Sequence, residues 1–221
     1  MKRSHIGIVA CSAEGAALCY RTICAEGGLQ HPEVSMHTHP LVEYAERLER
    51  GDVQGIGELM LASARKLAAS GAEFLICPDN SIHQAYEYVA ARSPLPWLHI
   101  GEVVRADASA RGFQRLGLLG TRWLVDSKVY PDDYVRPSAA ACDEIHRIIM
   151  EELVYGVFKA ESVAYCTGLI GRMSCDAVIL GCTELPLILH DGNSPLPTLD
   201  STRLLARAAL RRASARPAPG R

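Results

Sequence analysis

The sequence predicts an α/β protein of two related lobes, each a parallel β-sheet flanked by helices, with the active site in the cleft between them. Short apolar runs alternate along the chain with helical patterns such as 57–70 and 142–155, where apolar residues recur three and four positions apart. Three apolar runs of the first half reappear in the same order in the second half. Alternating strands and helices favour parallel sheets covered on both faces, and ordered repetition indicates two copies of one unit.

The repeated runs define the expected lobes. Residues 5–12 resemble 115–121, since each is a glycine-bearing apolar strand that runs into a polar turn; 71–83 resemble 176–186, and 94–99 resemble 195–200. The first lobe is expected to comprise residues 1–104 together with 200–221, because a predicted helix at 202–213 returns to it, and the second lobe comprises 105–199. The tail 214–221, rich in proline and small residues, is expected to fray.

Composition narrows the class of protein. The chain is 48% hydrophobic and 22% charged with a net charge of −2, which is typical of a globular protein and lacks the basic stripe of a nucleic-acid binder. Because neither a signal peptide's apolar core nor a membrane-spanning run is evident, we expect a soluble, cytoplasmic protein with no nucleic-acid or membrane partner.

No cofactor or metal is predicted. The glycines form neither a phosphate-binding loop nor a dinucleotide fingerprint. The eight cysteines contain no C-x-x-C pair and are expected to be reduced thiols, mostly in the core. Residues His31, His37 and His39 lie close together in the sequence, but no further ligand with supportive spacing accompanies them, so a loop lining the pocket is the preferred interpretation.

A buried strand at 178–180 ends abruptly in polar residues. Gly181 permits a tight turn, and Thr183 can cap a following helix. The thiol of Cys182 is then expected at a helix N-terminus, where unpaired N–H groups favour thiolate and bind carboxylates. The competing interpretation is a buried cysteine that packs as a small hydrophobe.

The internal duplication places a second turn opposite the first. Ligands bind beyond the carboxyl ends of parallel strands, so the turns at 77–83 and 181–184 are expected to face each other across one cleft. A substrate carbon held between them could lose a proton to one side and receive one from the other, which inverts its configuration. The residues expected to stabilise the substrate carboxylate are Ser12, Asn80, Ser81, Thr121 and Thr183.

The motifs LGCTE at 180–184, LLGT at 118–121 and NSIH at 80–83 resemble those of the aspartate/glutamate racemase superfamily, which includes hydantoin racemases, maleate isomerases and arylmalonate decarboxylases. The resemblance covers nearly the whole chain and implies Rossmann-like lobes, dimerisation, and racemisation by two opposed bases without a cofactor. It implies that Cys182 is the second base or acid. The hydroxyl and amide residues just named become contacts for the substrate carboxylate and amine.

One position departs from this pattern. The family commonly has a cysteine immediately before the asparagine of its first motif, where this chain has Asp79, with Cys77 two residues earlier. Turns re-aim side chains, so we predict that Asp79 rather than Cys77 faces the cleft. Asp79 could also cap the following helix. With an ordinary pKa of about 3.9 for aspartate and about 8.5 for cysteine, the pair is asymmetric, and Asp79 is expected to act as base or orienter while Cys182 donates the proton.

Charged residues near these motifs have less certain roles. Lys159 and Arg47 are candidates to hold a distal substrate carboxylate, although a solvated helix face is the competing interpretation. Glu184 could polarise Cys182 or cap a helix, and His83 could assist the first turn or pack within its helix.

The sequence therefore predicts a cofactor-independent, homodimeric racemase of a small acidic amino acid, aspartate or glutamate. One alternative keeps the fold and changes the reaction to decarboxylation or cis-trans isomerisation of a small dicarboxylic acid. The other is a non-catalytic protein that only binds its ligand.

Overall fold

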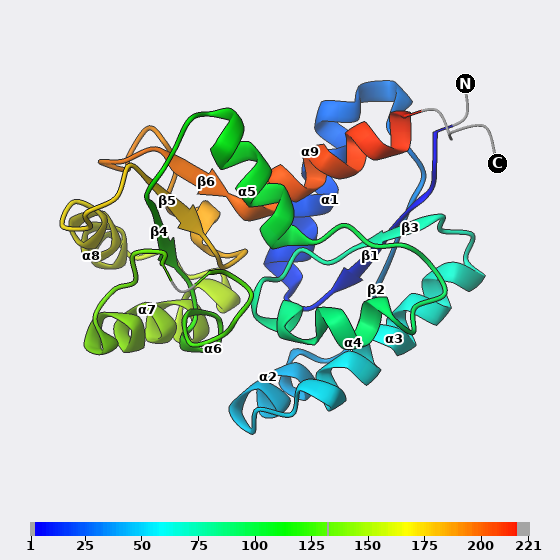
Figure 1. The fold of residues 1–221 in the computed structure, drawn as a ribbon, viewed down its shortest axis with the longest axis horizontal. Helices are drawn as coiled ribbons and strands as arrows, with labels where there is room; N and C mark the ends of the chain where they lie inside the picture. Colours follow the sequence, from blue (N-terminus) through cyan, green and yellow to red (C-terminus); the bar gives the residue numbers. More distant parts are fainter. Residues whose placement is uncertain (1–2, 132, 216–221) are drawn as a thin grey trace.

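Two three-stranded parallel sheets form the framework of the computed structural model, which describes residues 3–131 and 133–215 (Figure 1). The first sheet has the order β2-β1-β3, with strands Ile6–Ala10 (β1), Val34–Thr38 (β2) and Phe74–Ile76 (β3). The second has the order β4-β5-β6, with strands Leu116–Leu119 (β4), Ala177–Leu180 (β5) and Thr198–Asp200 (β6). The predicted α/β fold of two parallel-sheet lobes is confirmed.

Helices cover both sheets, as strands buried on two faces require. Those that follow the strands of the first sheet are α1 (Ala13–Gly27), α2 (Leu41–Glu49), α3 (Val53–Ala69) and α4 (Tyr86–Ala90), with 3-10 turns η1 (Gly28–Gln30) and η2 (Ser81–Ala85). Those around the second are α6 (Arg122–Val125), α7 (Ala139–Glu151) and α8 (Ala160–Ile170), with η3 (Leu153–Tyr155) and η4 (Leu185–Leu187). The helical patterns at 57–70 and 142–155 correspond to α3 and to α7 with η3.

A fourth segment joins each sheet through one isolated β-bridge, and with it the two sheets show the same order of segments. Trp97 pairs in parallel with Leu75 of β3, and Val135 pairs in parallel with Gly117 of β4. Including these segments, the orders are β2-β1-β3-97 and 135-β4-β5-β6, so β1 corresponds to β4, β3 to β5, and the segment at 97 to β6. The three repeated sequence runs therefore occupy equivalent places in the two sheets.

Corresponding turns of the two copies contain matching hydrogen bonds. Ser93 Oγ donates to the carbonyl of Leu95 over 2.8 Å, and Ser194 Oγ donates to the carbonyl of Leu196 over 2.7 Å. Ser12 caps α1 by accepting from an N–H group, and Thr121 caps α6 in the same way. These matched details link the sequence repeat to a repeated local structure.

Two helices cross between the lobes. Leu205, Ala206 and Ala209 of α9 (Ser201–Ser214), which follows the second sheet, pack against β1 and β3 of the first sheet. Conversely, Val104 and Ala108 of α5 (Ile100–Ala110) pack against β4 and β5. The two helices lie side by side in the middle of the molecule (Figure 1). The boundary predicted between residues 104 and 105 falls inside α5, and the division into domains stays a prediction.

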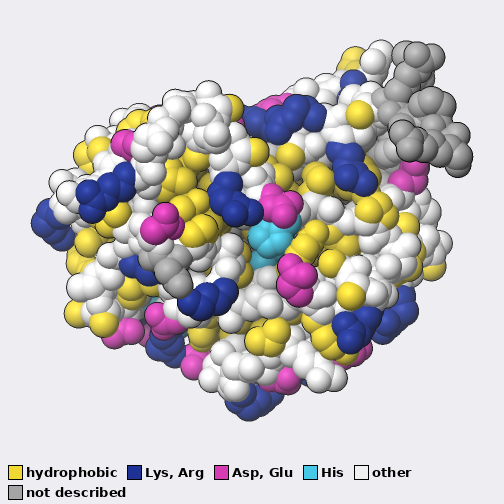
Figure 2. Space-filling view, viewed as in Figure 1, with side chains coloured by type: hydrophobic (Ala, Val, Ile, Leu, Met, Phe, Trp, Pro, Cys, Tyr) yellow, Lys and Arg dark blue, Asp and Glu magenta, His cyan; other side chains and the backbone are white. Residues whose placement is uncertain are grey.

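The surface is mixed in charge. On the face shown in Figure 2, basic and acidic side chains are interspersed with apolar ones. Within residues 3–131 and 133–215, none of the helices combines the length and the apolar character that crossing a membrane requires. Of the tail predicted to fray, residues 216–221 lie outside the described residues, while Ser214 ends α9.

Candidate active site

A pocket lies where the carboxyl ends of the two sheets face each other. Its volume is about 420 Å³, counting the space at its mouth that is open to solvent. Loops after β1, β3, β4 and β5 supply its polar lining, which is Cys11, Ser12, Asp79, Asn80, Ser81, Thr121, Cys182 and Glu184. The turns that the sequence placed on opposite sides of one cleft thus meet in one narrow pocket.

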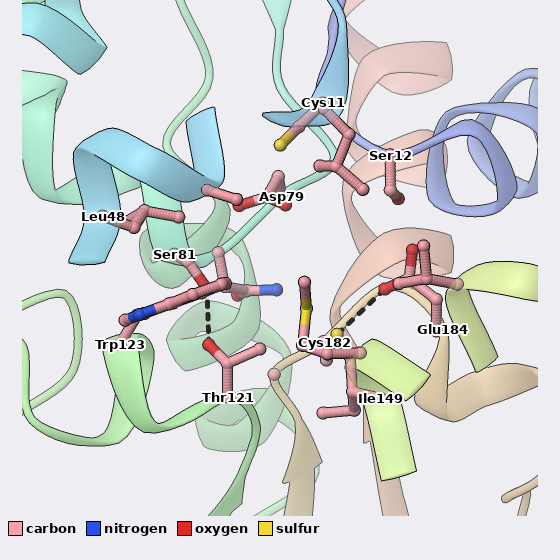
Figure 3. Close-up of a pocket in the computed structure, with 16 residues that line it drawn as sticks. Cys11, Ser12, Leu48, Asp79, Ser81, Thr121, Trp123, Ile149, Cys182 and Glu184 are labelled. Carbon is pink, nitrogen blue, oxygen red and sulfur yellow. Dashed lines mark hydrogen bonds between the residues drawn. The ribbon is translucent and has the colours of Figure 1, made fainter. Parts of the chain in front are cut away.

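Cys182 stands at the end of β5 beside an acidic partner. Cys182 is 8% exposed, and its thiol donates a hydrogen bond to Glu184 Oε2 over 2.9 Å (Figure 3). The Thr183 hydroxyl donates to the same oxygen over 3.0 Å. Burial and the neighbouring carboxylate raise the pKa of the Cys182 thiol well above its ordinary value. Cys182 therefore holds its proton at neutral pH.

This protonation state corrects the expected thiolate at a helix N-terminus. The segment after Cys182 is the single 3-10 turn η4, and no side chain caps it. One turn adds little helix dipole, whereas the carboxylate of Glu184 lies in direct contact with the sulfur. The acidic neighbour therefore outweighs the backbone, and Thr183 binds Glu184 instead of capping a helix.

Asp79 and a second thiol form the facing pair. Asp79 lines the pocket, accepts a hydrogen bond from the backbone N–H of Ile82 over 3.0 Å, and lies beside the Cys11 thiol, which favours its ionised form. Burial raises the pKa of Asp79 to about 6. Figure 3 shows the Cys11 sulfur directed toward Asp79, with Cys182 and Glu184 on the other side of the pocket. Cys77 is fully buried in the hydrophobic core of the first lobe and is not among the lining residues.

The pocket therefore contains two thiol–carboxylate pairs, Cys11–Asp79 from the first lobe and Cys182–Glu184 from the second. Burial and Asp79 raise the pKa of the Cys11 thiol well above its ordinary value. Near pH 7 the carboxylate of Asp79 is ionised while the thiol opposite is protonated. An acceptor of protons thus faces a donor of protons.

Hydroxyl and amide groups tie the lobes together around these pairs. Ser81 Oγ and Thr121 Oγ1 are 2.9 Å apart (Figure 3), and Ser12 Oγ and Thr183 Oγ1 are 3.3 Å apart. Asn80 is 1% exposed; its side-chain amide donates to Ser201 Oγ and accepts from the Tyr130 hydroxyl. The predicted carboxylate contacts Ser12, Asn80, Ser81 and Thr121 all line the pocket, and Thr183 lies directly behind it.

The close approach of the lobes depends on a glycine. A Cβ atom added to Gly15 of α1 would lie 2.2 Å from Thr183 Oγ1. Any side chain here would push α1 away from the loop after β5. Gly15 therefore lets the first turn of α1 sit against the second lobe.

Neither cation proposed for a distal carboxylate reaches the pocket. Lys159 is half-exposed, and its Nζ lies 3.2 Å from Glu152 Oε1. Arg47 donates to the carbonyl of Glu43 over 2.6 Å on the outer part of α2. The structure does not bring these two residues to the site, because Glu152 holds Lys159 and Glu43 holds Arg47 outside the pocket.

His83 supports the turn that carries Asp79. Its Nδ1 donates to the Asp79 carbonyl oxygen over 2.5 Å, and its Nε2 accepts from the N–H of Ile100 over 3.3 Å. Burial lowers the pKa of His83 to about 3, so the ring is neutral. Both nitrogens are occupied, and His83 packs behind the turn.

The histidines at 31, 37 and 39 do not line the pocket, so the expected role for them is wrong; His37 lies on β2. His37 contacts Ser63 Oγ over 2.9 Å through Nδ1 and Lys66 Nζ over 2.8 Å through Nε2. In the part of the chain that the structure describes, no three His, Cys, Asp or Glu side chains are placed together to hold a metal ion.

Sequence reasoning missed Cys11 and the apolar wall of the pocket. Cys11 follows β1 and precedes the capping Ser12, the same strand-to-cap position that drew attention to Cys182 after β5. The wall comes from α2, α6, α7 and η3 and comprises Leu41, Ala45, Leu48, Trp123, Ile149, Met150 and Val154. The spacing of Leu41, Ala45 and Leu48 marks one helix face, but spacing alone does not show that the face borders a site.

Comparisons with known proteins agree with this architecture. The family model of Asp/Glu/hydantoin racemases matches residues 9–209. The broad specificity amino-acid racemase RacX of Bacillus subtilis is 21% identical over 87% of this chain and 86% of its own length. A glutamate racemase of Thermus thermophilus is 34% identical over 50% of this chain and 44% of its own length.

Solved structures show the same fold. An aspartate racemase homologue from Pyrococcus horikoshii superimposes with a TM-score of 0.80 at 25% identity, over 97% of this chain and all of that one. Glutamate racemase from Thermus thermophilus superimposes with a TM-score of 0.62 at 19% identity, over 95% of this chain and 80% of that one. The family resemblance and the enzyme class predicted from the motifs are confirmed: the chain belongs to the Asp/Glu/hydantoin racemase family.

Proposed function

We propose that the protein racemises a free amino acid without a cofactor, by removing and returning the α-proton between Asp79 and Cys182. The observation that carries this proposal is the pair of facing groups in one pocket, an ionised carboxylate opposite a protonated thiol. Acid and base on opposite faces of one carbon are what inversion requires.

In one direction the steps balance as follows. Asp79 takes the proton from Cα, and the electron pair of the C–H bond moves onto the substrate carboxylate as a second negative charge. Cys182 then delivers its thiol proton to the opposite face of Cα. The product is the other enantiomer, with Asp79 protonated and Cys182 left as thiolate, and proton exchange with water restores the starting state.

The lining offers partners for both charged groups of the substrate. Glu184 is 2% exposed, and its Oε1 has no hydrogen-bond partner among the described residues. A buried acceptor without a partner is costly, so an α-ammonium group that donates to it would stabilise the complex. Ser12, Ser81 and Thr121 line the pocket with hydroxyls that bond to each other and to Thr183, and these would exchange such partners for the α-carboxylate.

The vacant acceptor supports an amino acid over the dicarboxylic acid of a decarboxylase or isomerase, since such an acid brings no cation to Glu184. Aspartate and glutamate, the substrates predicted from the motifs, remain candidates at this level. The names of the relatives include a glutamate racemase and a broad specificity racemase, which supports amino-acid racemisation but leaves the side chain open. A homodimer and a cytoplasmic location stay predictions.

Incubation of single enantiomers in D2O tests the proposal. Proton NMR should show loss of the α-proton signal, and chiral chromatography should show the opposite enantiomer. The proposal would be overturned if no amino acid exchanged its α-proton. It would also be overturned if the enzyme released CO2 from a substituted malonate instead of exchanging the α-proton of an amino acid.

A further inference from the structure

The side of the pocket next to the reacting groups is apolar. Leu48 of α2 and Trp123 of α6 lie together on one side, away from Glu184 (Figure 3). Ile149, Met150 and Val154 of α7 and η3 add further apolar lining, with Ile149 on the side of Cys182 (Figure 3). The Nε1 atom of Trp123 lies at the end of the indole remote from Cys182.

The charges that line the pocket are all of one sign. Among the described residues, Asp79 and Glu184 are the charged groups of the lining, and both are acids. Two basic residues on the helices that carry the wall, Arg122 of α6 and Arg147 of α7, have acidic partners: Arg122 pairs with Glu49, and Arg147 Nη1 lies 2.9 Å from Glu152 Oε1. A negatively charged substrate side chain would find no basic group in this lining.

The cost of such a second substrate carboxylate is large. Like charges about 6 Å apart in an effective dielectric of about 20 repel enough to weaken binding about 100-fold. An apolar side chain gains instead, because each methylene placed against a hydrophobic wall improves kcat/KM by about 10-fold or more. The wall therefore discriminates between amino acids by the charge and size of their side chains.

We propose that the substrate is an amino acid with an uncharged, apolar side chain of the size of leucine, methionine or phenylalanine, bound against Leu48, Trp123 and Met150. This inference rests on the proposed racemase activity and specifies its substrate class. The α-ammonium faces Glu184, the α-carboxylate faces the hydroxyls, and the side chain extends along the wall.

A panel of amino acids in D2O tests the substrate class on the wild-type enzyme. The values of kcat/KM for α-proton exchange with leucine, methionine and phenylalanine are expected to exceed those for aspartate and glutamate by about 100-fold. Equal or faster exchange with aspartate or glutamate would overturn the inference and leave the racemase proposal standing. Exchange with none of the five would overturn both.

Variants locate the discrimination on the wall. Leu48→Arg places a cation beside the substrate side chain and is expected to lower the preference for leucine over aspartate at least about 10-fold. Val42→Arg adds the same charge to the same helix, at a side chain that is 57% exposed and outside the pocket, and should leave the preference unchanged. The assignment of the wall as the side-chain site would be contradicted by an equal change of preference in both variants. It would also be contradicted by an unchanged preference in a Leu48→Arg enzyme that keeps its melting temperature.

Discussion

Asp79→Asn separates a proton acceptor from a structural cap at the same position. The carboxylate of Asp79, two residues before η2 begins, accepts from Ile82 N–H in the manner of a helix cap, and an asparagine oxygen can accept the same hydrogen bond with nearly the same shape. The variant therefore keeps the cap and removes the base. Loss of a general base lowers the rate by about 10²- to 10⁴-fold, so α-proton exchange at pH 7.5 should fall within that range.

Stability should not fall with it. Because burial raises the pKa of Asp79 to about 6, the folded protein binds a proton more tightly than the unfolded chain does, and stability declines as pH rises through this value. At pH 7.5 the ionised carboxylate opposes folding, so the neutral amide should leave the melting temperature equal or higher. The assay pairs exchange rates by NMR with thermal unfolding.

Asp52→Asn provides the matched control. Asp52 caps α3 by accepting from Gly55 N–H over 2.8 Å and does not line the pocket. This variant should keep full activity. Unchanged exchange in Asp79→Asn would refute the assignment of Asp79 as the base, because a cap alone is preserved by the substitution.

Three further predictions concern pH, the second carboxylate and the contact between the lobes. Exchange should rise about tenfold per pH unit up to about pH 6 and then level off, as Asp79 loses its proton. Cys11→Ala should move this rise to higher pH, since the neighbouring Cys11 thiol lowers the pKa of Asp79. A flat profile between pH 5 and 8 would contradict this. Glu184→Gln should speed alkylation of Cys182 by iodoacetamide about tenfold for each unit by which the thiol pKa falls. Mass spectrometry of the peptide that contains Cys182 measures the rate. Slower alkylation would argue against Glu184 as the group that raises the pKa of this thiol. Gly15→Ala should lower the free energy of unfolding by about 1–3 kcal/mol, because the added Cβ overlaps with the second lobe. Gly168 is exposed on α8, and a Cβ added there would have no heavy atom nearer than 3.6 Å, so Gly168→Ala should raise this free energy by up to about 1 kcal/mol. Equal shifts of the two variants in chemical denaturation would refute the steric argument.

The duplicated fold could be predicted because its signals are local. Strand-to-turn transitions at 5–12 and 115–121, and the repeated turn at 94–99 and 195–200, depend on residues a few positions apart. The helix at 202–213 is expected from the sequence to return to the first lobe, but the packing of α5 against the second sheet could not be read in the same way. It depends on which sheet offers the larger uncovered apolar face, and this is decided only when both lobes are assembled.

The candidate site could likewise be predicted only where its signals are local in the sequence. The motif around Cys182 and the replacement at Asp79 drew attention to two positions that the structure brings into one pocket. The pairing of Cys11 with Asp79 joins two segments far apart in sequence, and the thiol's proton state depends on Glu184, which a helix-dipole argument does not include. Lys159 looked suitable by charge, but its partner Glu152 holds it outside the pocket.

The central claim is that two groups on opposite faces of Cα exchange the proton, and the isotope content of substrate and product at early times tests it most directly. Each enantiomer of leucine is converted separately in D2O, and both pools are analysed by mass spectrometry before one tenth has reacted. A mechanism with two groups places deuterium in the product and almost none in the remaining substrate, because the proton removed by Asp79 is not the one that Cys182 returns. Equal labelling of substrate and product from the start would show that a single base serves both faces of Cα, and the two-group mechanism would be wrong.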